Sequence, residues 1–419
     1  MAPIGDPGRT GPDPVWMRRA LELAALGRGT TSPNPMVGAV LVRDGVAVGE
    51  GFHRAPGEPH AEAVALREAA DRAAGATCYV TLEPCGHHGR TPPCAPALIA
   101  AGVARVVAAI EDPDPNVRGK GFAQLRAAGV QVEVGVGAAA AEAQNAAFLL
   151  HRRQGRPRVT LKAAASLDGK VAAPDGTSQW ITGEAARADA HRLRAEADAV
   201  AVGAGTALAD DPRLTVRLPG WSGRQPLRVL LDATGRTVTG PTGRGGPAGA
   251  TGSTVAAGRT GPTGRTVTDP RTGPAAHALG QLFDGAAPTL VATTAAAPRA
   301  ALQAWTAAGA EVLVCPDAPA ASGEAGVDLA FIAKSLGERG VLELLVEGGP
   351  RLHASFWEAG LADRLVWYLA PLVIGGDGAP GLLPAAGAHT LTAARAVRIE
   401  TVDRLGPDLR IVGYPQEGT

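Results

Sequence analysis

The chain alternates between short apolar runs and helix-like segments, and this alternation constrains its fold more than any other feature. Apolar runs bounded by Gly, Pro and Asp indicate strands, and longer segments with apolar residues three or four apart indicate helices. The expected elements of the first part are a helix that begins at Asp13, a hairpin (37–42 and 46–48), helices (60–73, 94–101, 121–128 and 138–153) and strands (77–82, 105–110 and 130–134). Such alternation favours an α/β fold with helices layered on a sheet.

A second alternation begins after Gln154-Gly155-Arg156-Pro157, a segment that interrupts the helical pattern. Its expected elements are a helix (185–197) and strands (159–165, 199–202, 227–231, 289–292, 311–314 and 342–346). A chain of 419 residues has room for about two or three domains. We therefore expect a first domain over 13–155 and a second over 156–419.

Two segments lack the apolar residues that a folded core needs. Residues 1–12 are rich in Gly and Pro without periodicity, and we expect a disordered tail. Residues from about 236 to 274 repeat Gly, Thr, Pro and Arg, which predicts a disordered insertion within the second domain. A linker between domains is the less favoured alternative, because the strands that resume after this segment need partners in a sheet.

Charge and hydropathy exclude several classes of partner. The 40 basic residues balance the 40 acidic ones, so the chain lacks the broad positive charge that nucleic-acid binding requires. It has no apolar run that approaches 18 residues, and its first residues lack the pattern of a secretory signal. We therefore expect a soluble, cytoplasmic protein without a nucleic-acid or membrane partner, whose four cysteines are reduced.

A histidine, a glutamate and two thiols fall within a short stretch of the first domain. His60-Ala61-Glu62 precedes Pro84-Cys85, and Cys94 follows after eight intervening residues. A catalytic zinc ion takes three protein ligands and leaves its fourth position to water, so His60, Cys85 and Cys94 form a suitable set. Zinc deaminases carry H-x-E followed by P-C-x-x-C, in which the glutamate carries protons and is not a ligand. The match is complete except for the longer segment between the cysteines.

Two other interpretations of these residues remain at this point. A structural zinc site is closed by four ligands, and His87 or His88 could provide the fourth. Alternatively, the thiols are unrelated packing residues, as we expect for Cys78 and Cys315. Glu62 favours a catalytic site, because a structural zinc has no use for an acid two residues from its ligand.

Three motifs in order resemble the bifunctional pyrimidine deaminase/reductase family of riboflavin biosynthesis. They are TSPNPMVG (31–38), HAE (60–62) and EPCGHHGRTPPC (83–94). The resemblance implies a cytidine-deaminase-like three-layer α/β/α domain followed by a dihydrofolate-reductase-like α/β domain. It also implies Zn²⁺ bound by His60, Cys85 and Cys94, proton transfer by Glu62, and substrate contacts from Asn34 and His53. A turn residue is the alternative for Asn34, and an ordinary surface histidine for His53.

Further motifs resemble the reductase half of the same family, over about 157–376 outside the insertion. They are LKAAASLDGK (161–170), SQWITG (178–183) and TALADDPRLTVR (206–217), and they imply NADPH as cofactor. By this resemblance the cofactor-binding residues are Ala164, Trp180, Thr206, Asp210, Gly349, Pro350, Arg351 and Leu352. The substrate-binding residues are Lys162, Ser178, Arg194, Leu214, Arg217 and Glu347.

The residue types in the second domain fit phosphorylated ligands. Arg194 and Arg217 are candidate phosphate clamps, because a guanidinium group binds phosphate oxygens in a bidentate manner. Glu347-Gly348-Gly349 ends an apolar strand before an expected helix, whose start would accept a cofactor phosphate although no GxGxxG motif is present. The alternatives are solvated arginines, a plain helix cap and, for Trp180, a core aromatic residue.

The resemblance implies two reactions on one chain. A hydrolase acting on a cyclic amidine would deaminate 2,5-diamino-6-(5-phosphoribosylamino)pyrimidin-4(3H)-one, and an NADPH-dependent oxidoreductase would reduce the ribosyl group of 5-amino-6-(5-phosphoribosylamino)uracil to ribityl. A cytidine or tRNA-adenosine deaminase fused to an unrelated module is disfavoured by the long segment between the cysteines and by the neutral charge. A zinc-stabilised scaffold or sensor without turnover is disfavoured by Glu62. The sequence leaves a homo-oligomer open.

Overall fold

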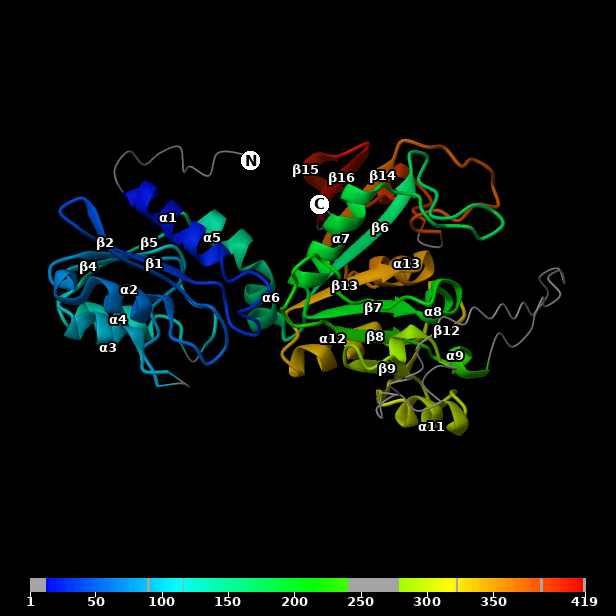
Figure 1. The fold of residues 1–419 in the computed structure, drawn as a ribbon, viewed down its shortest axis with the longest axis horizontal. Helices are drawn as coiled ribbons and strands as arrows, with labels where there is room; N and C mark the ends of the chain where they lie inside the picture. Colours follow the sequence, from blue (N-terminus) through cyan, green and yellow to red (C-terminus); the bar gives the residue numbers. More distant parts are fainter. Residues whose placement is uncertain are drawn as a thin grey trace, which may run out of the picture.

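The structure is a computed structural model that describes residues 13–88, 91–115, 117–239, 279–321, 323–384 and 387–416. Within these residues the chain forms two α/β domains side by side, with helix α6 (Ala146–Gln154) at their junction (Figure 1). The expected tail and most of the expected insertion lie outside the described residues. In the described part of the chain, no helix is long and apolar enough to cross a membrane.

The first domain is built on a five-stranded sheet of order β2-β1-β3-β4-β5. Strand β1 pairs antiparallel with β2 in the expected hairpin and also with β3, whereas β3, β4 and β5 run parallel. The carboxyl ends of β3 and β4 therefore lie at the same edge of the sheet. The strands are β1 (Gly38–Arg43), β2 (Val46–Phe52), β3 (Thr77–Val80), β4 (Arg105–Ala108) and β5 (Gln131–Val134).

Helices cover both faces of this sheet and give the expected three layers. Leu98 and Leu125 are buried on one face, and Met17 and Phe148 are buried on the other. The first face carries α2 (Ala61–Ala69) with the 3₁₀ turn η1 (Ala70–Ala73), α3 (Cys94–Ala100) and α4 (Lys120–Ala127). The second face carries α1 (Asp13–Ala25), α5 (Ala138–Gln144) and α6.

Helix α2 lies unusually close to strand β2. A Cβ atom at Gly51 would lie 2.3 Å from the carbonyl oxygen of Ala61, and one at Gly49 would lie 2.2 Å from that of Ala65. Only glycine allows this approach, because any side chain would push the helix away from the sheet. The close packing fixes the first turn of α2, and with it His60 and Glu62, relative to the strands.

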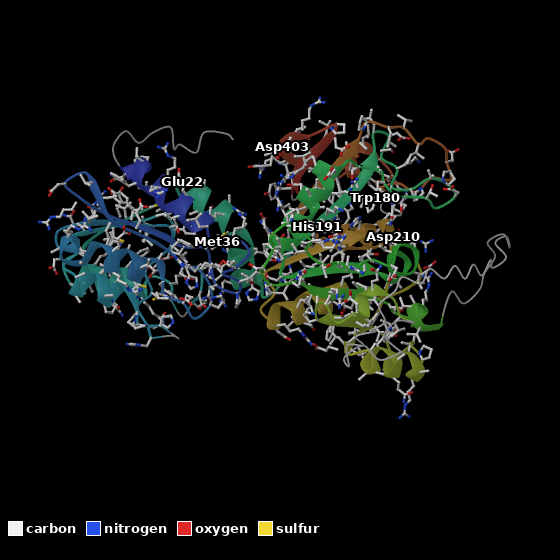
Figure 2. All side chains as sticks on the ribbon, in the orientation of Figure 1. Glu22, Met36, Trp180, His191, Asp210 and Asp403 are labelled. Carbon is white, nitrogen blue, oxygen red and sulfur yellow. The ribbon has the colours of Figure 1, made fainter. Side chains whose placement is uncertain are left out.

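The prediction of one continuous helix over 138–153 is wrong, because the structure has two helices there, α5 and α6, divided at Asn145. The buried Asn145 side chain accepts a hydrogen bond from the backbone N–H of Met36 and donates one to the Met36 carbonyl, both at 2.9 Å. Met36 lies near the junction of the two domains (Figure 2). Pairing with a segment 109 residues away therefore replaces a continuous helix.

The expected insertion begins later than residue 236. Residues Arg236–Thr239 form the short helix α9, in which Thr237 accepts a hydrogen bond from the indole N–H of Trp305 and donates one to Asp232. Trp305 is fully buried, so this turn is anchored to the core of the second domain.

The second domain is built on a nine-stranded sheet of order β10-β9-β8-β7-β13-β6-β14-β16-β15. The strands from β10 to β14 run parallel, and β16 and β15 complete the edge in antiparallel pairing. The strands are β6 (Arg158–Ser166), β7 (Ala199–Gly203), β8 (Leu227–Leu231), β9 (Thr289–Thr293), β10 (Glu311–Val314), β13 (Glu343–Gly348), β14 (Arg364–Ala370), β15 (Val397–Leu405) and β16 (Asp408–Pro415). A separate two-stranded sheet pairs β11 (Asp317–Pro319) with β12 (Ala325–Val327).

Helices also cover both faces of the larger sheet. Ile332 and Phe356 belong to the buried cluster on one face, and Leu193 and Trp305 to the cluster on the other. The first cluster includes α12 (Leu329–Glu338) and α13 (Pro350–Glu358), and the second includes α7 (Glu184–Glu196) and α11 (Arg299–Ala307). The remaining elements are α8 (Ala204–Asp210) and the 3₁₀ turns η2 (Gln281–Phe283) and η3 (Leu391–Ala393).

Candidate functional site

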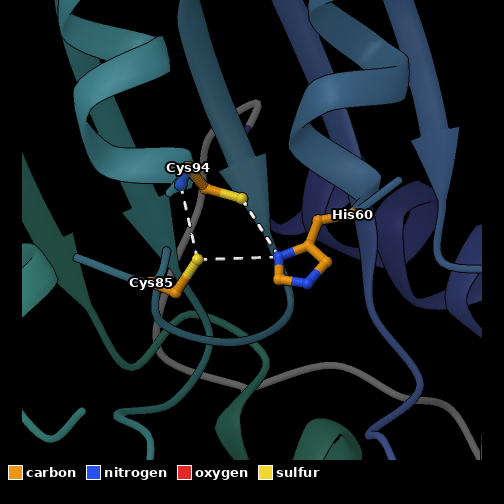
Figure 3. A group of neighbouring side chains, drawn as sticks. All are labelled: His60, Cys85 and Cys94. Carbon is orange, nitrogen blue, oxygen red and sulfur yellow. Dashed lines mark hydrogen bonds between the residues drawn. The ribbon is translucent and has the colours of Figure 1, made fainter. Parts of the chain in front are cut away.

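Three predicted metal ligands converge in the first domain. The Nδ1 atom of His60 lies 3.3 Å from Sγ of Cys94 and 3.6 Å from Sγ of Cys85, and all three atoms lie within 4.8 Å of one another (Figure 3). His60 directly precedes α2, Cys85 follows β3, and Cys94 is the first residue of α3. Residues distant in sequence are therefore brought together by two helix starts and one strand end.

The separations fit a tetrahedral zinc ion. Zinc–sulfur and zinc–nitrogen bonds of ordinary length place an imidazole nitrogen about 3.6 Å from a thiolate in a tetrahedral site. Two thiolates and one imidazole are donors that zinc prefers, and they leave one position open. His87 and His88 are exposed and lie outside this group, so the described residues do not support a closed four-ligand site.

The surroundings of Cys85 favour its thiolate, which is the form that binds metal. The Cys94 thiol, then the neighbouring His60 ring and the Cys94 backbone N–H, lower the pKa of Cys85 to about 4, while the same pairing with Cys85 raises the pKa of Cys94. In contrast, Cys78 is fully buried within β3, where burial raises the pKa of its thiol. The expectation that Cys78 is a packing residue agrees with this position.

Glu62 lies in the first turn of α2, two residues from His60, and the residue is only 4% exposed. Burial, followed by the charge of Cys85, raises the pKa of Glu62 to about 7. A carboxyl group with such a pKa gains and loses a proton near neutral pH, as a general acid–base catalyst must.

Asn34 and His53 lie beside this cluster. The Asn34 side-chain nitrogen donates a hydrogen bond to Nε2 of His53 at 3.0 Å, while Nδ1 of His53 donates to the carbonyl of Pro59 at 3.2 Å. The His53 ring packs edge-on against His60, with centroids 5.5 Å apart. His53 is buried, so the alternative of an ordinary surface histidine is wrong. Burial also lowers the pKa of His53, which favours the neutral ring that these hydrogen bonds need.

The sequence analysis did not identify Glu83, which organises the backbone before Cys85. Its buried carboxylate accepts hydrogen bonds from the backbone N–H groups of Gly119 at 2.9 Å and Gly121 at 3.0 Å. A Cβ atom at Gly121 would lie 1.8 Å from the Pro84 carbonyl oxygen. The segment that leads into α4 is thereby held against the zinc-binding motif. The position of this acidic residue directly before Pro84-Cys85 is the sequence feature that could have indicated its role.

The second domain contains a large cavity at the carboxyl ends of β6, β7 and β13, with a volume of about 1490 Å³. Single-ligand pockets usually enclose about 300–1,000 Å³, so this one has room for a cofactor and a substrate together. Trp180, His191 and Asp210, which line this cavity, are labelled in Figure 2. The cavity is lined by every residue assigned to the second domain's ligands: Lys162, Ala164, Ser178, Trp180, Arg194, Thr206, Asp210, Leu214, Arg217, Glu347, Gly349, Pro350, Arg351 and Leu352.

Glu347 is the buried anion of this cavity. Arg194 donates to both of its carboxylate oxygens, at 2.5 and 2.8 Å, and Nζ of Lys162 lies 3.8 Å away. Burial opposes ionisation, but Arg194 and Lys162 hold the pKa of Glu347 at about 2. Arg194 also donates to the carbonyl of Thr215, so much of its guanidinium group is already engaged.

Arg217 has no carboxylate partner among the described residues. Its Nη1 atom lies 3.3 Å from the Thr215 hydroxyl. Burial and then the charges of Arg194 and Arg213 lower its pKa. The region around Arg217 therefore carries more positive than negative charge, which suits a phosphate group.

His191 is a cavity residue that the sequence analysis missed. It lies on α7 one turn before Arg194, and its Nδ1 atom accepts a hydrogen bond from the Arg217 backbone N–H at 3.3 Å. Burial, followed by Arg194 and Arg217, lowers the pKa of His191 to about 4. Its position three residues from Arg194 was a usable signal, because such residues share a face of a helix.

The start of α13 is suited to a cofactor phosphate. A Cβ atom at Gly349 would lie only 2.8 Å from the Thr206 hydroxyl, so the backbone approaches α8 closely. Pro350 begins the helix directly after Gly349, and a helix start attracts negative charge. Trp180 is 70% exposed and lines the cavity, so its alternative as a core residue is wrong. These features fit a dinucleotide cofactor.

Family comparisons cover both domains. The model described as the cytidine and deoxycytidylate deaminase zinc-binding region matches residues 12–110, and the model of the RibD C-terminal domain matches residues 157–410. The riboflavin biosynthesis protein RibD of Escherichia coli is 40% identical over 96% of this chain and 99% of its own length. The chain belongs to the RibD family.

Solved RibD structures agree with this assignment. RibD of Acinetobacter baumannii is 35% identical, covers 97% of this chain and 99% of its own, and has a TM-score of 0.78. A protein of Thermotoga maritima with 30% identity covers 96% of this chain and 99% of its own, with a TM-score of 0.75. It is described as a diaminohydroxyphosphoribosylaminopyrimidine deaminase/5-amino-6-(5-phosphoribosylamino)uracil reductase. The fold class expected from the resemblance is confirmed.

As a RibD protein, the chain is a bifunctional enzyme of riboflavin biosynthesis, with a deaminase domain followed by a reductase domain. The first uses zinc and the second NADPH. The alternatives of a deaminase fused to an unrelated module and of a scaffold without turnover are therefore wrong.

The charges around His191 allow us to predict how its pKa responds to a bound phosphate. A phosphomonoester bound beside Arg217 would offset the positive charge that lowers the pKa of His191, so that pKa should rise from about 4. NMR titration of the histidine, with and without ribose 5-phosphate, measures the change, and ribose without phosphate is the control. An unchanged pKa under saturating ribose 5-phosphate would place the phosphate elsewhere.

Proposed function

We propose that residues 13–155 deaminate 2,5-diamino-6-(5-phosphoribosylamino)pyrimidin-4(3H)-one and that residues 156–419 reduce the resulting 5-amino-6-(5-phosphoribosylamino)uracil to its ribityl form. The observation that carries this proposal is the convergence of His60, Cys85 and Cys94 beside the buried Glu62. The description of the Thermotoga maritima relative supports the choice of substrates.

In the deaminase domain, His60, Cys85 and Cys94 would hold a zinc ion, which would supply an activated water as nucleophile when bound. Glu62 is placed to accept a proton from the attacking water and to donate one to the departing amine, so that oxygen would replace the exocyclic amine. The Asn34 side-chain nitrogen is engaged with His53, which leaves its oxygen to accept a hydrogen bond from the pyrimidine. His53 acts on the substrate through Asn34.

In the reductase domain, NADPH when bound would supply a hydride for C1′ of the opened ribose. Its site comprises Ala164, Trp180, Thr206, Asp210 and the start of α13 from Gly349 to Leu352. Lys162, Ser178, Leu214 and Glu347 face the substrate, and Arg217 binds its phosphate. Arg194, first expected to be a second phosphate clamp, holds the Glu347 carboxylate in place through two hydrogen bonds. We therefore assign it mainly a positioning role.

The overall charge and the chemistry of the two sites also bear on the partners and the location of the protein. The neutral overall charge supports small phosphorylated pyrimidines, rather than nucleic acid, as the ligands. A cytoplasmic location fits an enzyme that uses NADPH and reduced zinc-binding thiols.

Replacement of Glu62 separates metal binding from proton transfer. Glu62→Gln should retain zinc but lose deamination by at least about 10²-fold, the usual contribution of a general acid–base group. Bound zinc and ammonia release should be measured on the same sample. The matched variant Cys85→Ser should lose or weaken zinc binding while reduction of the uracil substrate continues. If Glu62→Gln loses its metal, the glutamate is not the proton carrier proposed here.

Two arginine replacements separate phosphate binding from the positioning of Glu347. Arg217→Ala should raise KM for the phosphorylated uracil more than it lowers kcat, because the contact exists before and during reaction. Arg194→Ala should instead lower the stability of the reductase domain by about 3–5 kcal/mol, because it leaves Glu347 buried without its main partner. Arg299 is exposed, and the variant Arg299→Ala serves as a control for both measurements. A lower NADPH affinity with unchanged substrate KM in Arg217→Ala would assign this arginine to the cofactor.

A further inference from the structure

Thr91 lies in the segment between Cys85 and Cys94, and it contacts the predicted zinc ligand His60. Its hydroxyl oxygen lies 3.0 Å from Nε2 of His60. The other ring nitrogen of His60, Nδ1, faces the sulfur atoms of Cys85 and Cys94. The two nitrogens therefore have separate partners, and Thr91 is the one hydrogen-bond partner of Nε2 in the described part of the chain.

We propose that Thr91 is a positioning residue for the zinc site. Its hydroxyl oxygen accepts a hydrogen bond from the Nε2–H group of His60, and this bond fixes the tautomer and the orientation of the ring. The inference rests on the proposed role of His60 as a ligand. It adds a partner that holds the ligand in place, which neither the motif spacing nor the ligand chemistry identified.

The chemistry of imidazole explains why such a partner matters. A neutral imidazole carries one N–H group and one nitrogen lone pair. If Nδ1 directs its lone pair to the metal, the proton must reside on Nε2, and a metal-binding histidine usually donates this second N–H to an oxygen atom. The Thr91 hydroxyl provides that oxygen. Without it, the Nε2–H group would lose this partner, and the metal bond alone would hold the orientation of the ring.

The position of Thr91 also gives a reason for the long spacing between the cysteines. Pro92 and Pro93 link Thr91 to Cys94, and proline restricts the backbone that joins them. Pro93 then leads directly into α3. One stiff segment therefore places both the ligand Cys94 and Thr91, the hydrogen-bond partner of the ligand His60. A two-residue segment between the cysteines is too short to carry both functions.

The test compares Thr91→Val, which has nearly the same shape without the hydroxyl, with Thr91→Ser, which keeps the hydroxyl. Zinc affinity of the full-length protein is measured by competition with a chromogenic chelator. Thr91→Val should bind zinc about 10- to 100-fold more weakly, the usual effect of removing such a partner, and Thr91→Ser should stay close to the original protein. The visible absorption of Co²⁺ loaded in place of zinc should also change in Thr91→Val alone, because it reports ligand geometry. Unchanged NADPH-dependent reduction shows that the variants are folded.

Two further variants distinguish the possible failures. His88→Ala alters an exposed residue of the same segment and should leave zinc affinity unchanged, while His60→Ala should abolish tight binding. If His60→Ala loses zinc but Thr91→Val does not, the positioning role is wrong and the ligand set stands. If His60→Ala also retains zinc, the proposed ligand set itself fails. A higher KM for the pyrimidine with unchanged zinc affinity in Thr91→Val would make Thr91 a substrate-binding residue and overturn the proposal.

Discussion

Parallel strands end at the same edge of a sheet, and both sites of this protein depend on that constraint. In the first domain the carboxyl end of β3 leads through Glu83 to Cys85. In the second, the ends of β7 and β13 and the neighbouring middle of β6 bring Gly203, Glu347 and Lys162 to one cavity. The helices that follow these strands then present their first residues to the same place. The sheet thus supplies the framework, and the strand-to-helix connections supply the chemical groups.

Two buried glutamates show how the surroundings assign different roles to one residue type. Burial, with the charge of Cys85, raises the pKa of Glu62 to about 7, so this carboxyl group can exchange a proton. Glu347 is also buried, but Arg194 and Lys162 hold its pKa at about 2 and keep it ionised. The first suits proton transfer during hydrolysis, and the second suits a fixed anion that orients a substrate. The two domains therefore use the same side chain in opposite protonation states.

The sequence predicted the features that short motifs encode. The zinc donors and Glu62 lie in two compact motifs, and most of the parallel strands are short apolar runs, so these features were predictable. Strands β14, β15 and β16 were not among the expected elements, and charged residues interrupt the apolar pattern of β15. The division of a helix at Asn145 was not, because it depends on hydrogen bonds to Met36, which is 109 residues away. The pairing of Arg194 with Glu347 joins residues 153 apart, so the motif around Arg194 does not reveal it. Local patterns carry no information about such long-range partners.

The central claim is that one chain carries out deamination and then reduction at two separate sites. The most direct test is to incubate the zinc-loaded protein with the diaminopyrimidine phosphate, with and without NADPH, and to identify the products by mass spectrometry. Without NADPH, the uracil in which oxygen has replaced the amine should accumulate together with ammonia. With NADPH, this uracil should be converted to the ribityl product. A reduced product that still carries the exocyclic amine, formed in place of the uracil, would contradict the account.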